Sequence, residues 1–193
     1  PVENIDLLTR YGSDSEGVQL DKLGGAAWQA RKAKAKERLR EMADGLIKLA
    51  AARALKATGE IEPPHGLFDE FCARFPYEET DDQLNAIQDV LEDLGAGRPM
   101  DRLICGDVGF GKTEVALRAA FVVAMSGQQV AVVCPTTLLA RQHFKTFSER
   151  FQGWPVKVRQ LSRMVSAKEA AETRAGLKDG SIEVVVGTHA VLS

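Results

Sequence analysis

Short apolar runs that alternate with helix-forming stretches constrain the fold of this chain more than any other feature of its sequence. Between the apolar runs, residues 114–126, 138–151 and 167–178 have the composition of helices. β-branched strands interleaved with helices are typical of a parallel sheet that is covered on both faces. We therefore predict an α/β fold whose ligands bind at the carboxyl ends of the strands. The predicted strands are residues 101–107, 129–136, 156–162 and 182–189.

A glycine-rich stretch, GDVGFGKT, follows the first predicted strand and opens a helix. It fits the phosphate-loop pattern G-x-x-x-x-G-K-[ST]. Glycine lets main-chain N–H groups close around phosphate oxygens, and the helix N-terminus attracts the same anion. Lys112 would reach the β- and γ-phosphates of ATP and Thr113 would coordinate Mg²⁺, so we predict these two as catalytic residues. The predicted nucleotide-binding residues are Phe75, Gln83, Gly106, Asp107, Val108, Gly109, Phe110, Gly111, Lys112, Thr113 and Glu114.

Gln83 has two possible roles. Its amide carries the donor and acceptor that match the N6 and N7 edge of adenine, and Phe75 could stack on or flank the base. Alternatively, Thr80 and Gln83 form a capping box for the helix that starts at residue 81. The spacing alone favours neither role, and both can hold at once.

Polar residues also follow the later predicted strands. Thr136 and Thr137 open a helix after one strand, Arg163 follows the next, and Gly187, Thr188 and His189 end the last. Hydroxyls and free N–H groups at such positions suit the phosphates of a nucleic acid. Ordinary N-capping by threonine is the favoured explanation of a single case, but three such strand ends on one edge favour nucleic acid. We predict these residues as nucleic-acid contacts, and we do not predict His189 as a metal ligand.

The segment before the sheet divides in two. Residues 2–11 are strand-like, and residues 26–58 form one predicted long helix with an apolar stripe at three- and four-residue steps. The first half of this helix is basic, which is typical of a solvated helix end and also compatible with an acidic partner. Glycine and a tandem proline then end it. The stripe consists of Leu39, Met42, Ala43, Leu46, Ile47, Leu49, Ala50 and Arg53.

The composition excludes some classes of protein. The net charge is −2, apolar residues make up 45% of the chain, and no run resembles a membrane span or a secretory signal. Cys72, Cys105 and Cys134 lack metal-ligand spacing, and Cys105 and Cys134 are expected to be small buried hydrophobes. We expect a cytoplasmic protein with no membrane partner.

Five stretches together carry a family resemblance: FPYEETDDQ, GDVGFGKTEVA, PTTLLARQH, SRMVSAKE and GTHAVL. They resemble the first motor lobe of superfamily 2 helicases and, more narrowly, the Mfd family of bacterial transcription-repair coupling factors. The related RecG proteins typically have serine where Phe110 stands. The resemblance implies that Gln83 and Phe75 read adenine, and that the strand-end residues face DNA.

The resemblance also implies an organisation and partners. Residues 1–25 would be the end of an RNA polymerase-interacting domain, residues 26–62 a connector (relay) helix, and residues 63–193 part of a first RecA-like domain with an incomplete parallel sheet. The family implies an ATP- and Mg²⁺-dependent translocase on double-stranded DNA. It would displace stalled RNA polymerase and recruit the excision-repair protein UvrA through parts not present in this chain.

A motor of this type also needs an Asp-Glu strand and arginine fingers from a second lobe, and neither is found in the sequence. We therefore expect the chain alone not to hydrolyse ATP efficiently, and to be marginally stable or to pair with another copy. The alternatives are a RecG-like motor for branched DNA, a small phosphate-loop enzyme such as a nucleotide kinase, and an interaction module that does not bind nucleotide.

Overall fold

A computed structural model describes residues 25–192 of the 193-residue chain. The strand-like residues 2–11 and the predicted domain remnant before residue 25 lie outside the described residues. The chain divides into two units, Pro1–Ala52 and Arg53–Ser193, and each is treated separately below.

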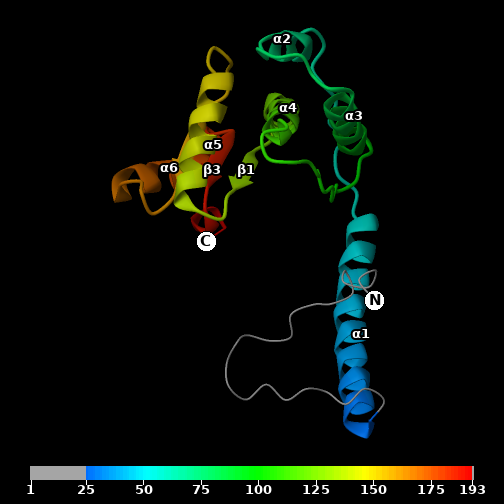
Figure 1. Cartoon of the computed structure of the whole chain (residues 1–193). Coiled ribbons are helices and arrows are strands. Elements are labelled where there is room, and N and C mark those ends of the chain that lie inside the picture. The colour runs from blue at the N-terminus through cyan, green and yellow to red at the C-terminus, as the bar shows by residue number, and fades with distance from the viewer. Residues whose placement is uncertain (1–24, 193) are drawn as a thin grey trace, which may run out of the picture. The chain divides into compact units, whose positions relative to one another are not determined.

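The first unit contains most of the long helix α1, Ala26–Ala54 (Figure 1). None of its residues is buried in the described part of the chain, and the apolar side chains of the stripe, Leu39 to Ala50, are exposed. The helix ends about one turn before the predicted residue 58. The backbone there turns away, and the N–H of Thr58 donates to the carbonyl of Gly97 at 2.8 Å instead of continuing the helical pattern.

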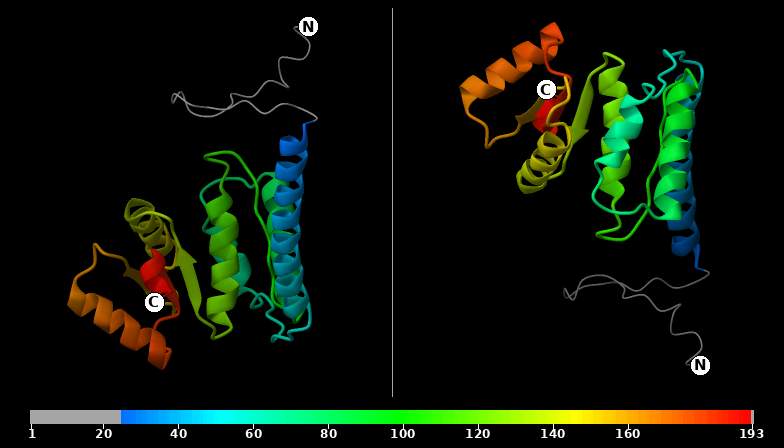
Figure 2. Two further views of the ribbon diagram at one scale, coloured as in Figure 1. Left: turned by 90° about the horizontal axis from the view of Figure 1, so that it is seen from below. Right: turned by 90° about the horizontal axis from the view of Figure 1, so that it is seen from above.

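The second unit begins with helices α2, Leu67–Ala73, α3, Asp81–Gly95, and α4, Lys112–Met125. Helix α4 is mostly buried and lies between α3 and strand β1, Val130–Val133 (Figure 2). Helix α3 is amphipathic, and its buried residues Ile87 and Val90 pack with Val115 of α4. This packing connects α3 to the helix that begins at the phosphate loop.

The sheet is parallel, as predicted, and has the strand order β1-β3-β2. Strand β1 is followed by α5, Thr137–Arg150, then by β2, Val158–Leu161, and α6, Ala167–Asp179. Strand β3, Val184–Gly187, is buried along its whole length because it pairs with β1 on one side and with β2 on the other. A short 3-10 helix, His189–Val191, follows. The predicted α/β fold is therefore confirmed.

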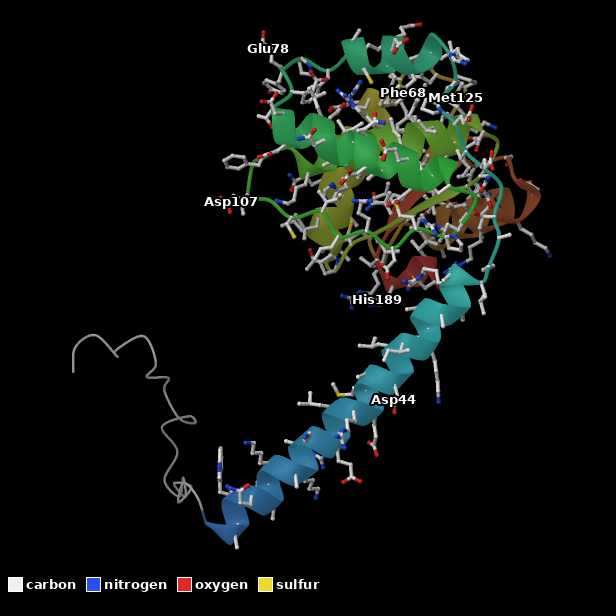
Figure 3. The ribbon with its side chains drawn as sticks, turned by 90° about the vertical axis from the view of Figure 1, so that its right-hand side faces the viewer. Asp44, Phe68, Glu78, Asp107, Met125 and His189 are labelled. Carbon is white, nitrogen blue, oxygen red and sulfur yellow. The ribbon has the colours of Figure 1, made fainter. Side chains whose placement is uncertain are left out.

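Aromatic rings fill the space between α2, α4 and α5. The rings of Phe71 and Phe121 stack at 4.2 Å between centroids, and Phe151 and Trp154 pack around them. Phe68 and Met125 pack against the same cluster (Figure 3). Each buried ring contributes strongly to stability through the hydrophobic effect. The cluster therefore holds α2 against α4 and the end of α5.

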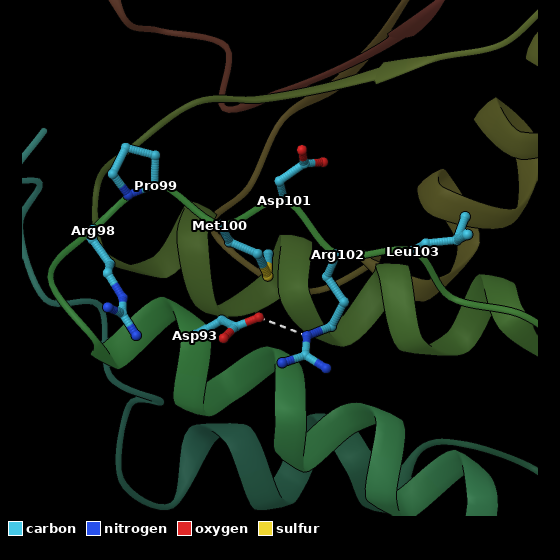
Figure 4. A pocket seen from close by; sticks show the side chains of 7 residues that line it. All are labelled: Asp93, Arg98, Pro99, Met100, Asp101, Arg102 and Leu103. Atoms are coloured by element: carbon cyan, nitrogen blue, oxygen red, sulfur yellow. Dashed lines mark hydrogen bonds and ion pairs between the residues drawn. The ribbon is translucent and has the colours of Figure 1, made fainter. Parts of the chain in front are cut away.

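The predicted strand 101–107 is wrong, because these residues do not form a strand in the structure. No other segment among residues 25–192 pairs with them, and a strand needs a neighbour to satisfy its backbone groups. Instead, Arg102 turns toward α3, where its Nε donates to Asp93 Oδ2 at 2.6 Å beside a hollow of about 400 Å³ (Figure 4). Leu103 is 85% exposed, and Cys105 is exposed rather than buried as predicted. Cys134, at the end of β1, is buried as predicted.

Candidate nucleotide and nucleic-acid sites

The phosphate loop adopts a backbone that only glycine accepts easily. Gly109 has φ +87° and Gly111 has φ +70°, both in the left-handed region. A Cβ at Gly111 would also collide with the side-chain amide nitrogen of Gln83. These two glycines bring the chain from the extended segment into the first turn of α4 at Lys112.

Lys112 closes the loop on itself. Its ammonium donates to the carbonyl oxygens of Gly106 and Asp107, both at 2.6 Å. The side chain thus lies across the inside of the loop, at the N-terminus of α4, where an anion is favoured. A triphosphate can take the place of the two carbonyl oxygens as partner of the ammonium, so the residues fit the predicted phosphate site. Val108 and Phe110 face solvent with 99% and 64% exposure.

Gln83 uses both ends of its amide within the protein. The capping box is present: Oε1 accepts from the N–H of Thr80 at 2.9 Å, and the Thr80 hydroxyl accepts from the N–H of Gln83 at 3.3 Å. In addition, Nε2 donates to the carbonyl of Phe110 at 3.0 Å, which connects α3 to the phosphate loop. One N–H and one lone pair of the amide are left for a base.

A hollow of about 500 Å³ lies beside the first turn of α4. Phe75 and Tyr77 line it from the loop after α2, and their rings meet edge to face at 5.5 Å. Thr113 lines it from the phosphate-loop side. Gln83 instead lines a neighbouring hollow of about 100 Å³ together with Lys112. The structure therefore brings Phe75 and Thr113 to one hollow, and Gln83 and Lys112 to the next.

A buried network of charges lies under the larger hollow. Glu114 is 5% exposed and Arg118 is 3% exposed, and Arg118 Nε donates to Glu114 Oε1 at 3.0 Å. From α5, Arg150 Nη2 donates to the same oxygen at 2.7 Å, and its Nη1 donates to the carbonyl of Phe71 at 3.1 Å. The other end of the Arg118 guanidinium donates to Glu79.

The network changes the acid–base behaviour of its members. The hydrogen bond from Arg118 lowers the pKa of the Glu79 carboxyl below its ordinary value. Burial works to lower the pKa of Arg118, but the hydrogen bonds to Glu79 and Glu114 outweigh it and the pKa is raised. The lowered pKa of Glu79 and the raised pKa of Arg118 keep this ion pair charged at neutral pH.

Glu114, predicted to contact nucleotide, lines the larger hollow with Thr113, and its carboxylate accepts hydrogen bonds from two arginines. Arg118, Arg150 and Glu79 were not among the residues predicted for the site. The spacing of Glu114 and Arg118 at i and i+4 in a helix was a signal for one pair. Nothing in the sequence pointed to Arg150 or Glu79, because they approach from other elements.

The residues predicted to contact nucleic acid gather at one edge, since β1, β2 and β3 are parallel and their carboxyl ends meet. Thr136 is the N-cap of α5, and its hydroxyl accepts from the N–H of Leu139 at 3.3 Å, so the capping alternative is present. Thr137 is half-buried in the first turn of α5, and Arg163 is exposed after β2.

The last three predicted contacts follow β3. Gly187 is buried, and an added Cβ would collide with the carbonyl oxygen of Leu161 in β2, so glycine is required for the strands to approach. The N–H of Thr188 donates to the same carbonyl at 3.2 Å, and His189 is exposed at the start of the 3-10 helix. The carboxyl edge of the sheet thus combines the first turn of α5 with two exposed side chains, Arg163 and His189.

The residues between 25 and 192 contain no cluster of three His, Cys, Asp or Glu side chains that could hold a metal ion. A magnesium ion bound with nucleotide would take ligands from the phosphates and from the Thr113 hydroxyl. None of the helices in the described part of the chain combines the length and the apolar character that a bilayer crossing requires.

Comparisons with known proteins agree with these observations. Over its whole length the chain is 55% identical to the transcription-repair-coupling factor of Rickettsia bellii (strain RML369-C), 48% identical to that of Bacillus subtilis (strain 168) and 46% identical to that of Escherichia coli (strain K12). The chain spans only 17%, 16% and 17% of these three proteins.

Two solved structures are also similar. A structure of RecG bound to a three-way DNA junction matches 74% of this chain and 20% of that one, with a TM-score of 0.69 and 34% identity. A hypothetical ATP-dependent RNA helicase from Sulfolobus tokodaii matches 67% of this chain and 35% of that one, with a TM-score of 0.51, and at 18% identity it supports the fold alone.

A family model described as DEAD/DEAH box helicase matches residues 80–193. The match covers more than half of the chain, and it includes the capping box of α3, the phosphate loop and all three strands. The chain belongs to the DEAD/DEAH box helicase family.

Proposed function

We propose that this chain is part of the first motor lobe of an ATP-driven, double-stranded DNA translocase that displaces stalled RNA polymerase and couples transcription to excision repair. The observation that carries the proposal is the phosphate loop at the start of α4, with Lys112 across its interior. The similarity to transcription-repair-coupling factors over the whole chain supports the rest.

In this proposal, Lys112 and the N–H groups of Gly109–Thr113 bind the phosphates of ATP, and Thr113 holds Mg²⁺. ATP with magnesium supplies the free energy for movement along DNA. Phe75 flanks the base in the larger hollow, and the remaining hydrogen-bonding capacity of Gln83 contributes to reading it. Asp107, Val108 and Phe110 form the outer part of the loop.

The carboxyl edge of the sheet would face DNA. Thr136 and Thr137 offer hydroxyls and the free N–H groups of α5, while Arg163 and His189 supply exposed polar groups on the same edge. Gly187 and Thr188 place the last strand close enough to complete this surface. Contacts of this kind position a protein on the phosphate backbone without reading sequence.

The proposed organisation assigns residues 1–25 to the end of a polymerase-interacting domain, residues 26–62 to a connector helix, and residues 63–193 to the motor lobe. RNA polymerase would be bound by the domain to which residues 1–25 belong, and UvrA by other parts of a longer cytoplasmic protein. Hydrolysis would need groups beyond those named here, so the 193-residue chain alone is expected to bind nucleotide without efficient turnover.

The test is Lys112→Ala, with Lys178→Ala in α6 as a control that removes the same side chain outside the loop. Mg-ATP at a hundredfold excess over its dissociation constant should stabilise the wild type and the control by about 2.7 kcal/mol. We expect Lys112→Ala to lose this stabilisation, measured as the shift in melting temperature. An equal shift in Lys112→Ala, or no shift in the wild type, would reject the proposal.

A second candidate, a motor for branched DNA, is favoured by the similarity to RecG at 34% identity. The identity to transcription-repair-coupling factors is higher and extends over the whole chain, including α1. A longer protein that contains this chain separates the two candidates: ATP hydrolysis stimulated by linear duplex supports the first, and stimulation only by three-way junctions supports the second.

A further inference from the structure

We infer that the ion pair between Glu79 and Arg118 is a positioning device that sets Phe75 in place for the base of the bound nucleotide. This inference rests on the proposed function, because it concerns the same hollow. It assigns Glu79 and Arg118 a role in nucleotide binding although neither contacts phosphate or metal. Their role concerns only the affinity for the base.

The first step concerns the loop between α2 and α3, which carries Phe75 and Tyr77 into the hollow. Both ends of the loop are fixed: the N–H of Phe75 donates to the carbonyl of Cys72 at 2.9 Å, and Thr80 caps α3. Between these ends the loop meets α4 at Arg118. The Glu79 carboxylate accepts a hydrogen bond from that guanidinium, whose Cζ lies 5.7 Å from the centroid of the Phe75 ring. One side chain of α4 therefore holds the loop at two points.

The second step concerns the rigidity of that side chain. Arg118 is 3% exposed, and its Nε is already bound to Glu114. Glu114 is held in turn by Arg150, whose guanidinium lies 4.2 Å from the centroid of the Phe71 ring. The planar guanidinium of arginine binds carboxylates in fixed directions, so Arg118 offers the loop a fixed anchor rather than a mobile charge.

The third step connects the anchor to ligand. Glu114 directly follows Thr113, and Phe75 and Thr113 line one hollow of about 500 Å³. We call the part of the hollow lined by Phe75 its base end and the part lined by Thr113 its phosphate end. One charge network, through Glu114 and Arg118, therefore reaches both ends. Glu79 is one of the two points at which this network holds the loop, and it is the most exposed member, with 25% of its side chain exposed. Removing that carboxylate loosens the base end and leaves the Arg118–Glu114–Arg150 part intact.

Because Glu79→Gln removes a negative charge, the variant protein would also attract any anionic ligand more strongly. This charge effect acts on both ATP and inorganic triphosphate, and more strongly on triphosphate, which carries one more negative charge, whereas a misplaced Phe75 weakens only the ligand that has a base. Comparing the ratio of the two affinities with that of a variant that loses the same charge elsewhere on the loop therefore separates positioning from charge.

The experiment measures binding of Mg-ATP and of magnesium inorganic triphosphate to the 193-residue chain by calorimetry. The variants are Glu79→Gln and the matched control Glu78→Gln, whose exposed side chain projects from the same loop (Figure 3). We expect Glu79→Gln to reduce the preference for ATP over triphosphate by about fivefold or more, the lower end of the contribution of stacking one base on an aromatic ring. Glu78→Gln should keep most of the wild-type preference.

A double variant tests the route of the effect. If Glu79 acts through Phe75, then Glu79→Gln should change the preference little when Phe75→Leu is already present, since residues that act together are not additive. Triphosphate binding by each variant shows that the phosphate loop is still folded.

The outcomes separate the two proposals. A wild type that binds neither ligand rejects the proposed function. A wild type that binds both ligands equally, an unchanged preference in Glu79→Gln, or an equal loss of both ligands in that variant rejects the inference and leaves the phosphate site standing.

Discussion

Residues 103–105 and residues 184–187 are both short apolar runs, but only the second forms a strand. Val184–Gly187 lies between two parallel strands and is buried along its length. Leu103 and Cys105, with the same apolar character, are exposed. The comparison teaches that strand propensity becomes a strand only where a neighbour pairs with it.

The two regions around these runs are consequently held by different forces. The β1-β3-β2 region is held by a backbone ladder and close packing. The phosphate-loop region is held by buried charges and by the side chains of Lys112 and Gln83, which bond to loop carbonyls. Each of the following predictions tests this difference.

The largest effect is expected from Arg118→Met, which removes the central cation of the charge network. It leaves Glu79 without its partner and leaves the buried Glu114 with Arg150 alone. Breaking a buried ion pair by removing one partner costs about 3–5 kcal/mol of unfolding free energy. The control is Arg102→Met, whose partners Asp89 and Asp93 are more exposed and solvent-screened, so a much smaller loss is expected. Urea unfolding measures both, and equal costs would contradict the distinction.

Gly187→Ala should be next, because the added Cβ would meet the carbonyl oxygen of Leu161 in the neighbouring strand. Overpacking of this kind costs about 1–3 kcal/mol. Gly106→Ala is the matched control in the unpaired region, since its Cβ would lie 3.5 Å from Lys112 Cγ, an ordinary contact. A urea midpoint that moves as much for Gly106→Ala as for Gly187→Ala would show that the two regions are equally tight.

A smaller effect should appear in acid. The pKa of Glu79 is lowered in the folded state by its hydrogen bond from Arg118, so its contribution to stability is present above the ordinary pKa of 4.5 and is lost as the pH falls through the lower folded value. Wild type should therefore exceed Glu79→Gln in stability at neutral pH. The difference should shrink below about pH 4.5. Unfolding midpoints measured from pH 7 downward check this, and a constant difference would be evidence against the ion pair.

The smallest effect concerns the cysteines. Cys105 is exposed in the unpaired region, whereas Cys134 is buried at the end of β1, and burial raises the pKa of the Cys134 thiol. Because the thiolate is the reactive form, maleimide should modify Cys105 well before Cys134. Mg-ATP should slow the reaction of Cys105, which lines the small hollow with Lys112. Mass spectrometry of the labelled peptides gives the order, and faster labelling of Cys134 would contradict the exposed path of residues 101–107.

Much of the fold could be predicted because its signals are local. The capping box of Thr80 and Gln83, the glycines of the phosphate loop and the alternation of strands with helices each depend on a few neighbouring residues. The ends of α4, α5 and α6 fell within about two residues of the prediction for the same reason. The end of α1 was misplaced because the partner of Thr58 is Gly97, which is distant in the sequence.

The sequence by itself determined the parallel α/β fold, the phosphate loop and the place of Lys112 and Thr113 in it, since these follow from backbone preferences and spacing. Only the tertiary structure decided that residues 101–107 remain unpaired, that Gly187 must have no side chain, and that Arg150 and Glu79 join Glu114 and Arg118 in one charge network. These outcomes depend on which distant residues come close in space. Pairing, steric contact and burial of charge arise between elements, and no local pattern of residues carries that information.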